Sequence, residues 1–206
     1  MSRTLLLASA STSRYSLLSN AGIVPLVQVS NVDEDAIQDH MPNATTAEKC
    51  IALAAAKGEA VAANITVSDS ANLLIVAADS MLDFEGVAYG KPGTPEVAIA
   101  RWKAMRGKFG TLHTGHWMHD TVTGQTRSGE AGAKVYFDDV SDAEIEAYVA
   151  SGEPLGVAGG FTHEGRSAAF IRTMDGDGPA VGGISLYLLR QFAHDMGISW
   201  HSLWGN

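Results

Sequence analysis

The chain has 206 residues, 46% of them hydrophobic, a formal net charge of -9 and a single cysteine. This length and apolar content predict one substantial core and a single domain over residues 1–206. The acidic balance argues against tight binding to polymeric DNA or RNA, which depends on basic surface. The lone cysteine lacks a disulfide partner, and we find no signal segment and no apolar run as long as a membrane span. These features predict a soluble, cytoplasmic protein.

The first unit is a buried strand over residues 4–8, a serine-rich turn over residues 9–13 and a helix that ends near Gly22. The free N–H groups at a helix start favour a phosphate, and the guanidinium of Arg14 can bind two phosphate oxygens. Alternatively, the serines only cap the helix and Arg14 is a solvated surface residue. The candidate anion ligands are Ser9, Ser11, Ser13 and Arg14.

Acidic and basic candidates follow in the next two units. A second short strand is expected over residues 24–30, followed by an acidic loop at residues 33–35. Loop carboxylates such as Glu34 can hold Mg²⁺, although on composition alone they are more often solvated charge. An alanine-rich helix over residues 45–63 carries Lys57 and Cys50, and we expect Cys50 to be a small buried apolar residue.

The most strand-like segment covers residues 73–78 and is expected to end at Asp79 and Ser80. Ligands gather at the carboxyl ends of strands in open α/β sheets, so Asp79 is a candidate for chemistry. The alternative is a turn-forming cap. A turn at residues 83–86 then leads to Gly90-Lys91-Pro92, which places Lys91 on a stiffened loop.

The second half of the chain continues the alternation. It predicts a helix over residues 94–107, a hairpin of strands around the turn at residues 123–125, and a helix from the capping box at Ser141. A glycine-rich segment over residues 152–165, a strand over residues 168–171 and a final helix over residues 185–196 complete it. His113, His116 and His119 lie on a predicted strand, where residues three apart face opposite sides, so the spacing argues against a metal site and leaves their role open.

Several common signatures are missing: the P-loop, the dinucleotide-binding glycine fingerprint, the nucleophile elbow and the zincin motif. The chain instead resembles the Maf family of nucleotide pyrophosphatases in a series of motifs that cover nearly its whole length in the family's order. These motifs are Leu6-Leu7-Ala8-Ser9-Ala10-Ser11 with Arg14, Val32-Asp33-Glu34, Leu53-Ala54 with Lys57, Ala78-Asp79-Ser80, Gly90-Lys91-Pro92, Gly152-Glu153-Pro154, Ala158-Gly159-Gly160-Phe161 with Glu164-Gly165, and Val181-Gly182-Gly183.

The resemblance implies an α/β fold of the Maf/ITPase-like type, a mixed sheet with flanking helices and a ligand cleft between two lobes. It also implies a cytoplasmic enzyme, commonly a homodimer, that uses Mg²⁺ or Mn²⁺. Such an enzyme hydrolyses nucleoside triphosphates at the α–β bond to a monophosphate and pyrophosphate, which would clear non-standard or modified nucleotides. By position, the family's phosphate ligands fall on Ser9 and Arg14, its two catalytic lysines on Lys57 and Lys91, and its metal-side acids on Glu34 and Asp79. Asp79 is also the carboxylate expected to orient or deprotonate the attacking water.

Three positions of the resemblance bear on which nucleotide base is preferred. Glu164 occupies the position where the family has Gln in members preferring dTTP and UTP and Glu in those preferring N7-methylguanosine triphosphate, which favours a guanine-type base. Ser80 is closer to the first group, and Ser13 stands where Arg or Trp is frequent. Thr12 replaces a usual proline. The alternatives are a member preferring dTTP and UTP, or a nucleotide-binding regulator of cell division without turnover.

Overall fold

A computed structural model describes residues 3–65 and 72–205. Its centre is a seven-stranded mixed sheet with the order β2-β1-β3-β5-β6-β7, and β4 pairs with β3 outside this path. β1 is parallel to β2 and to β3, whereas the other pairs are antiparallel. The strands are β1 (Thr4–Leu7), β2 (Leu26–Val27), β3 (Leu73–Phe84), β4 (Val87–Tyr89), β5 (Phe109–Asp120), β6 (Thr126–Phe137) and β7 (Ile171–Gly176).

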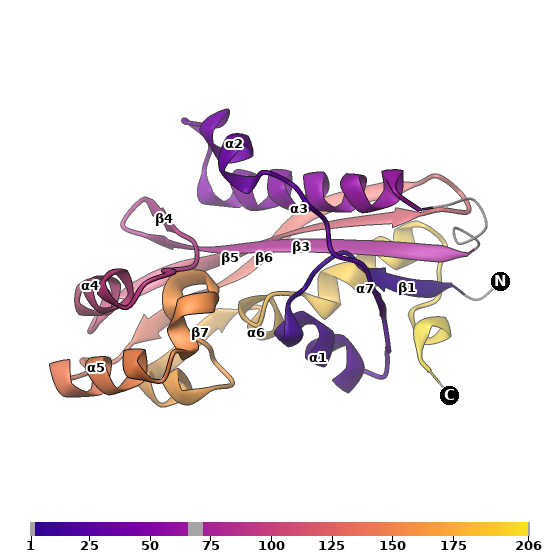
Figure 1. Cartoon of the computed structure of the whole chain (residues 1–206). Helices are drawn as coiled ribbons and strands as arrows, with labels where there is room; N and C mark the ends of the chain where they lie inside the picture. The colour runs from indigo at the N-terminus through magenta and orange to yellow at the C-terminus, as the bar shows by residue number, and fades with distance from the viewer. Residues whose placement is uncertain (1–2, 66–71, 206) are drawn as a thin grey trace.

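Helices cover the sheet on both faces, which confirms the predicted α/β class. Figure 1 shows α3 along one face, α1, α6 and α7 on the other, and α4 with α5 at the end away from both termini. Short 3₁₀ turns, among them η1 (Glu153–Gly156), η2 (Ala158–Gly160) and η3 (Arg166–Phe170), connect β6 to β7 after α5. The α-helices are α1 (Thr12–Asn20), α2 (Glu34–Asp39), α3 (Thr46–Ala63), α4 (Pro95–Met105), α5 (Asp142–Ala150), α6 (Gly178–Val181) and α7 (Leu186–Asp195).

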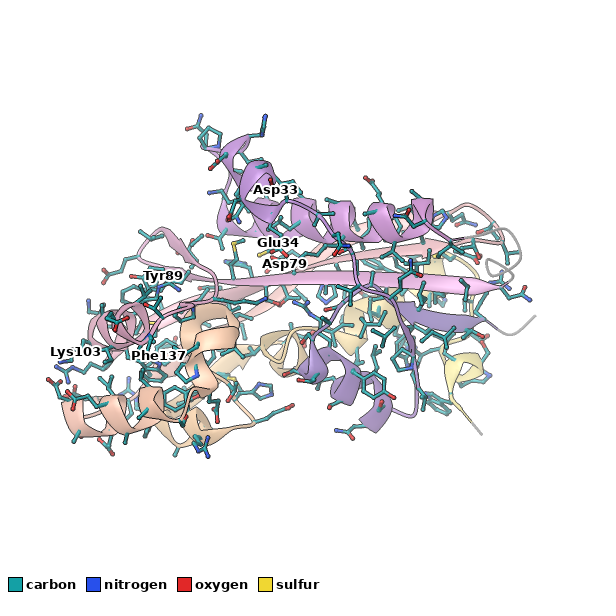
Figure 2. The ribbon with its side chains drawn as sticks, in the orientation of Figure 1. Asp33, Glu34, Asp79, Tyr89, Lys103 and Phe137 are labelled. Atoms are coloured by element: carbon teal, nitrogen blue, oxygen red, sulfur yellow. The ribbon has the colours of Figure 1, made fainter. Side chains whose placement is uncertain are left out.

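The core is divided between the two faces and the two ends of the sheet. Trp102 and Phe137 are fully buried in the cluster that includes α4 and α5, and Phe137 is labelled in this region of Figure 2. Leu18 and Leu189 belong to the cluster under α1 and α7, and Trp117 packs beneath α3. This arrangement gives two lobes with long strands running through both of them.

Local capping signals place most helices where the sequence predicts them. Ser11 accepts a hydrogen bond from Arg14 N at the start of α1, and Ser185 caps α7. Thr45 with Glu48 and Ser141 with Glu144 form capping boxes at α3 and α5. Such caps depend on residues within one turn, so they are readable before any tertiary contact forms. Cys50 is fully buried, as expected.

Four expected boundaries were wrong, three of them in the first half of the chain. Asp79 and Ser80 do not end the buried strand, because β3 continues to Phe84 by pairing with β5. Residues 33–35 are not a loop, since Asp33 accepts a hydrogen bond from Ala36 N and starts α2. The strand over residues 24–30 shrinks to Leu26–Val27, the two residues that β1 pairs.

The strand expected over residues 168–171 begins only at Ile171. The preceding residues form η3, where Ser167 Oγ accepts from Thr162 N and donates to Tyr148 OH, which holds the segment in a turn. Within the described ranges, no helix has the length and apolar character needed to cross a membrane.

Candidate active site

A gap along one edge of β3 creates the site. β1 pairs with β3 from Leu73 to Val76, and β4 pairs with it from Leu82 to Phe84. Among the described strands, none pairs on this side with the stretch between Val76 and Leu82, which contains Asp79 and Ser80. Alternate residues of a strand point to opposite faces, so these two neighbours reach different sides of the sheet.

A cleft of about 1030 Å³ opens at this gap. Its walls come from the turn before α1, from α2 and α3, from the Lys91 loop and from the glycine-rich segment that follows α5. Every side chain that the sequence predicts for the site lines this one cleft. These residues are Ser9, Ser11, Ser13, Arg14, Glu34, Lys57, Asp79, Ser80, Lys91 and Glu164.

Arg14 is fixed by three acceptors on the α1 side of the cleft. Its Nε donates to Gly183 O at 2.8 Å, Nη1 to Ser9 Oγ at 3.0 Å and Nη2 to Ser80 Oγ at 3.2 Å. Ser80 is itself held at 2.8 Å by the buried hydroxyl of Thr114. Arg14 is therefore not the solvated surface residue of the alternative interpretation, but a preorganised cation in the wall of the cleft.

The surroundings of Arg14 act on its charge in opposite directions. Burial lowers the pKa of Arg14 from its ordinary value, and the negative charges of Asp79 and Glu34 raise it. An arginine keeps its proton under these conditions because its ordinary pKa is so high. A desolvated cation in this position attracts an anion more strongly than a solvated one.

The start of α1 faces the same space. Ser9 is buried, and its Oγ accepts from Ser11 N at 3.2 Å in addition to Arg14. Ser13 occupies the first turn of the helix and is partly exposed at the cleft. Backbone N–H groups at this end carry the positive end of the helix dipole, which suits a phosphate oxygen.

On the opposite face of β3, Lys57 joins two carboxylates. Its Nζ lies 2.5 Å from Asp79 Oδ1 and 2.8 Å from Glu34 Oε1. Figure 2 shows Glu34 and Asp79 close together between α2 and β3, with Asp33 further out. The side chains of Lys57 and Asp79 are 12% and 10% exposed, whereas that of Glu34 is 44% exposed, so the cluster is buried at its base and open towards solvent.

Close packing of α3 on the sheet makes this contact possible. Gly58 follows Lys57, and a Cβ atom at Gly58 would overlap the indole ring of Trp117. A Cβ atom at Gly115, the residue paired with Asp79 on β5, would overlap the backbone of Cys50. The missing side chains let the helix approach closely enough for a lysine on α3 to meet a carboxylate on β3.

The two carboxylates are also the candidate metal ligands. Glu34 Oε1 and Asp79 Oδ1 converge on one ammonium, so both are aimed at a single cationic position. Within the described residues, no group of three or more histidine, cysteine or acidic side chains is placed so that it could hold a metal ion. Two carboxylates fit Mg²⁺, which is usually held by one or two carboxylates, with waters and substrate phosphates completing the shell.

Lys91 is exposed at the cleft on a loop that is hydrogen-bonded to α4 and to the glycine-rich segment. Gly90 O, directly before it, accepts from Arg101 Nη1 at 2.7 Å and from Gly159 N at 3.2 Å. Gly93 N donates to Leu155 O at 3.1 Å. The backbone on both sides of Lys91 is therefore held, and its ammonium is exposed to the cleft.

Glu164 lies on the far wall with more than half of its side chain exposed, and its Oε1 is 3.5 Å from His163 Nε2. Glu153, to which no role was assigned from the sequence, anchors this wall by accepting hydrogen bonds from Thr162 Oγ1 and Arg166 N. Burial raises the pKa of Glu153, but these hydrogen bonds outweigh it and leave the pKa below its ordinary value. A role for Glu153 could have been predicted from its position in the Gly152-Glu153-Pro154 motif.

The three histidines of β5 do not share a site. Their strand position is confirmed: His113 pairs with Glu130 at 2.7 Å and His119 contacts Thr126, whereas His116 is buried on the other face. Thr114 and His116 were both missed as site-supporting residues. The signal was two polar residues, two positions apart, between the apolar Leu112 and Met118 on one face of the strand.

A family model described as Maf-like protein matches residues 4–196. The chain belongs to the Maf-like family. A relative from Streptomyces coelicolor is 50% identical over 202 residues, which are 98% of this chain and 95% of the relative. A relative from Saccharopolyspora erythraea is 45% identical over 97% of this chain and 96% of the relative. A relative from Synechocystis is 42% identical over 99% of this chain and 100% of the relative. All three are named nucleoside triphosphate pyrophosphatase.

Proposed function

We propose that this Maf-like chain hydrolyses nucleoside triphosphates between the α and β phosphates, giving a nucleoside monophosphate and pyrophosphate. The observation that carries the proposal is the convergence of three cations, Arg14, Lys57 and Lys91, and two carboxylates on one cleft. The names of relatives that match nearly the whole chain support the same activity. Hydrolysis of a triphosphate needs several cations, because negative charge on the phosphate oxygens and on the leaving group must be neutralised as it develops in the transition state.

Arg14, Ser9 and Lys91 would bind and orient the triphosphate. The guanidinium of Arg14 is held rigidly by acceptors on one strand and two loops, so little freedom is lost when a phosphate binds. Lys91 is an exposed cation on an anchored loop and can bind the phosphates from the cleft entrance. Ser9 and the N-terminus of α1 add neutral donors.

Asp79 would act on the attacking water. In the hydrolysis, the water oxygen forms a bond to the α phosphorus, the bond to the α–β bridging oxygen breaks, and pyrophosphate leaves with that oxygen. The proton lost by the water passes to a carboxylate, and Asp79 at the base of the cleft can accept it. Lys57, already 2.5 Å from Asp79, would hold this carboxylate in its orientation.

A divalent cation, Mg²⁺ or Mn²⁺, fits the two-carboxylate donor set of Glu34 and Asp79. When bound, it would supply positive charge to the phosphates and to the leaving pyrophosphate. Lys57 then shares the carboxylates with the cation, so we expect its contact with Glu34, the more exposed of the two acids, to be the one that changes.

Glu164 would select the base. An ionised carboxylate only accepts hydrogen bonds, so it matches the adjacent N–H and NH₂ donors of a guanine edge better than the mixed edge of uracil or thymine. The side chain is about half exposed at the cleft, where a base can reach it. A guanine-type preference, which includes N7-methylated guanine nucleotides, goes with a role in clearing modified nucleotides, and we expect a cytoplasmic homodimer.

The test is pyrophosphate release from a panel of GTP, N7-methyl-GTP, UTP and dTTP in the presence of Mg²⁺. We expect turnover that is lost in excess chelator and in Asp79→Asn, while that variant still binds nucleotide. Binding without pyrophosphate release by the wild type would instead identify a nucleotide-binding regulator. Near wild-type turnover in Asp79→Asn would remove Asp79 from the mechanism.

A further inference from the structure

Two buried side chains on one face of β5 hold the segment between α6 and α7. Thr114 Oγ1 donates to Ala180 O at 2.8 Å, and His116 Nε2 accepts from Ser185 N at 2.7 Å. Thr114, His116 and Ser185 are each 0% exposed. The segment is therefore attached to the sheet on each side of Gly183.

Gly183 lines the cleft together with Val181 and Gly182, and it is the residue of this segment whose carbonyl Arg14 contacts. Its carbonyl accepts from Arg14 Nε at 2.8 Å, the shortest of the three hydrogen bonds that fix the guanidinium. Its φ of +106° lies in a region that favours glycine, and a Cβ atom here would crowd Arg14. The direction of the Gly183 carbonyl thus depends on how its neighbours are anchored.

We infer that His116 is a positioning residue for Arg14: it fixes Ser185 N, and thereby the Gly183 carbonyl, so that the guanidinium points at the nucleotide's phosphates. The inference rests on the proposed function, because it assigns Arg14 to the phosphates. It adds a residue that lies outside the lining of the cleft and acts through the backbone.

The contact requires a neutral imidazole of one tautomer. Ser185 N–H is an obligate donor, so Nε2 must carry the lone pair and the ring proton must be on Nδ1. Burial, and then the charge of Arg14, lower the pKa of His116 to about 4, which keeps the ring neutral near pH 7. Asp177 and Glu130 face it from neighbouring segments and act in the opposite direction.

The side chain of Ser185 makes a second set of hydrogen bonds, which cannot take over the bond from Ser185 N to His116. Ser185 Oγ donates to Asp177 Oδ2 at 2.5 Å and accepts from Leu188 N at 3.0 Å. These bonds fix the serine side chain and the start of α7. Without the imidazole, Ser185 N would be a buried donor without its acceptor, and the backbone would turn to find another.

The test compares His116→Phe, which keeps a ring but removes the acceptor, with His116→Gln, whose amide oxygen can reach the position of Nε2. For His116→Phe we expect kcat/KM for the preferred triphosphate to fall on the order of 10²-fold, because a cation displaced by about 1 Å loses that much. His116→Gln should recover most of it. His119→Phe, on the same strand outside the cleft, is the matched control and should be neutral.

A double-mutant cycle separates positioning from general damage. If His116 acts through Arg14, His116→Phe should cost little further activity in an Arg14→Ala background, whereas independent damage would multiply the two losses. If His116→Phe does not fold, His116→Asn, whose shorter amide lies nearer the Nδ1 position, takes its place. The inference about His116 would be overturned if the two losses multiply, or if His116→Phe is neutral while Arg14→Ala is damaging. The phosphate site at Arg14 would then still stand. A neutral Arg14→Ala would overturn the phosphate site as well.

Discussion

Substituting Gly58 by alanine tests whether the close packing of α3 on β5 controls the position of Lys57. The added Cβ would overlap the six-membered ring of Trp117, which is 4% exposed and packed in the apolar cluster under α3. To restore an ordinary contact distance, the helix has to move away from the sheet by on the order of 1 Å. Overpacking of this kind costs about 1–3 kcal/mol.

The same movement should affect catalysis, because Lys57 is the preceding residue and meets Asp79 at 2.5 Å. A displacement of about 1 Å in a catalytic group can lower the rate on the order of 10²-fold. We therefore expect Gly58→Ala to lower both the free energy of unfolding, measured in urea, and kcat/KM, measured by pyrophosphate release.

Gly178→Ala is the matched control. Gly178 begins α6, and a Cβ atom added to it would meet no heavy atom within 4 Å, so alanine should be neutral or slightly stabilising there. In a Trp117→Leu background, Gly58→Ala should cost less, since the ring that it meets is gone. A Gly58→Ala variant as stable and active as the wild type would refute the packing argument.

The remaining predictions concern charge and base recognition. Arg14→Ala should lower kcat/KM on the order of 10²-fold and Arg14→Lys should recover only part of it, because an ammonium cannot replace a guanidinium that meets three acceptors; full recovery would contradict this. His116 has its pKa lowered from 6.5 to about 4, so between these values the unfolded chain binds more protons and stability falls as the pH falls, by roughly 3 kcal/mol in total. Urea unfolding at several pH values should show a shallower fall for His116→Gln, and equal slopes would argue against a neutral buried imidazole. Glu164→Gln should shift the kcat/KM ranking from guanine nucleotides towards UTP and dTTP, and an unchanged ranking would exclude Glu164 as the selector.

Elements whose signals are local could be predicted from the amino-acid sequence. Ser11, Thr45 and Ser141 cap helices through bonds to residues within the next turn, so their starts could be predicted before any packing was known. The apolar stretch after Thr4 indicated a buried strand for the same reason. The resemblance to a family in ordered motifs added the residues that now line one cleft.

The roles of those residues depend on contacts between distant parts of the chain. Asp79 and Ser80 are neighbours in the chain, yet the pairing of β3 with β5 sends one towards Lys57 and the other towards Arg14. The supporting role of His116 follows from its contact with Ser185, 69 residues later. Strand register and contacts across such separations depend on the assembled sheet, which is why no local pattern in the sequence contains them.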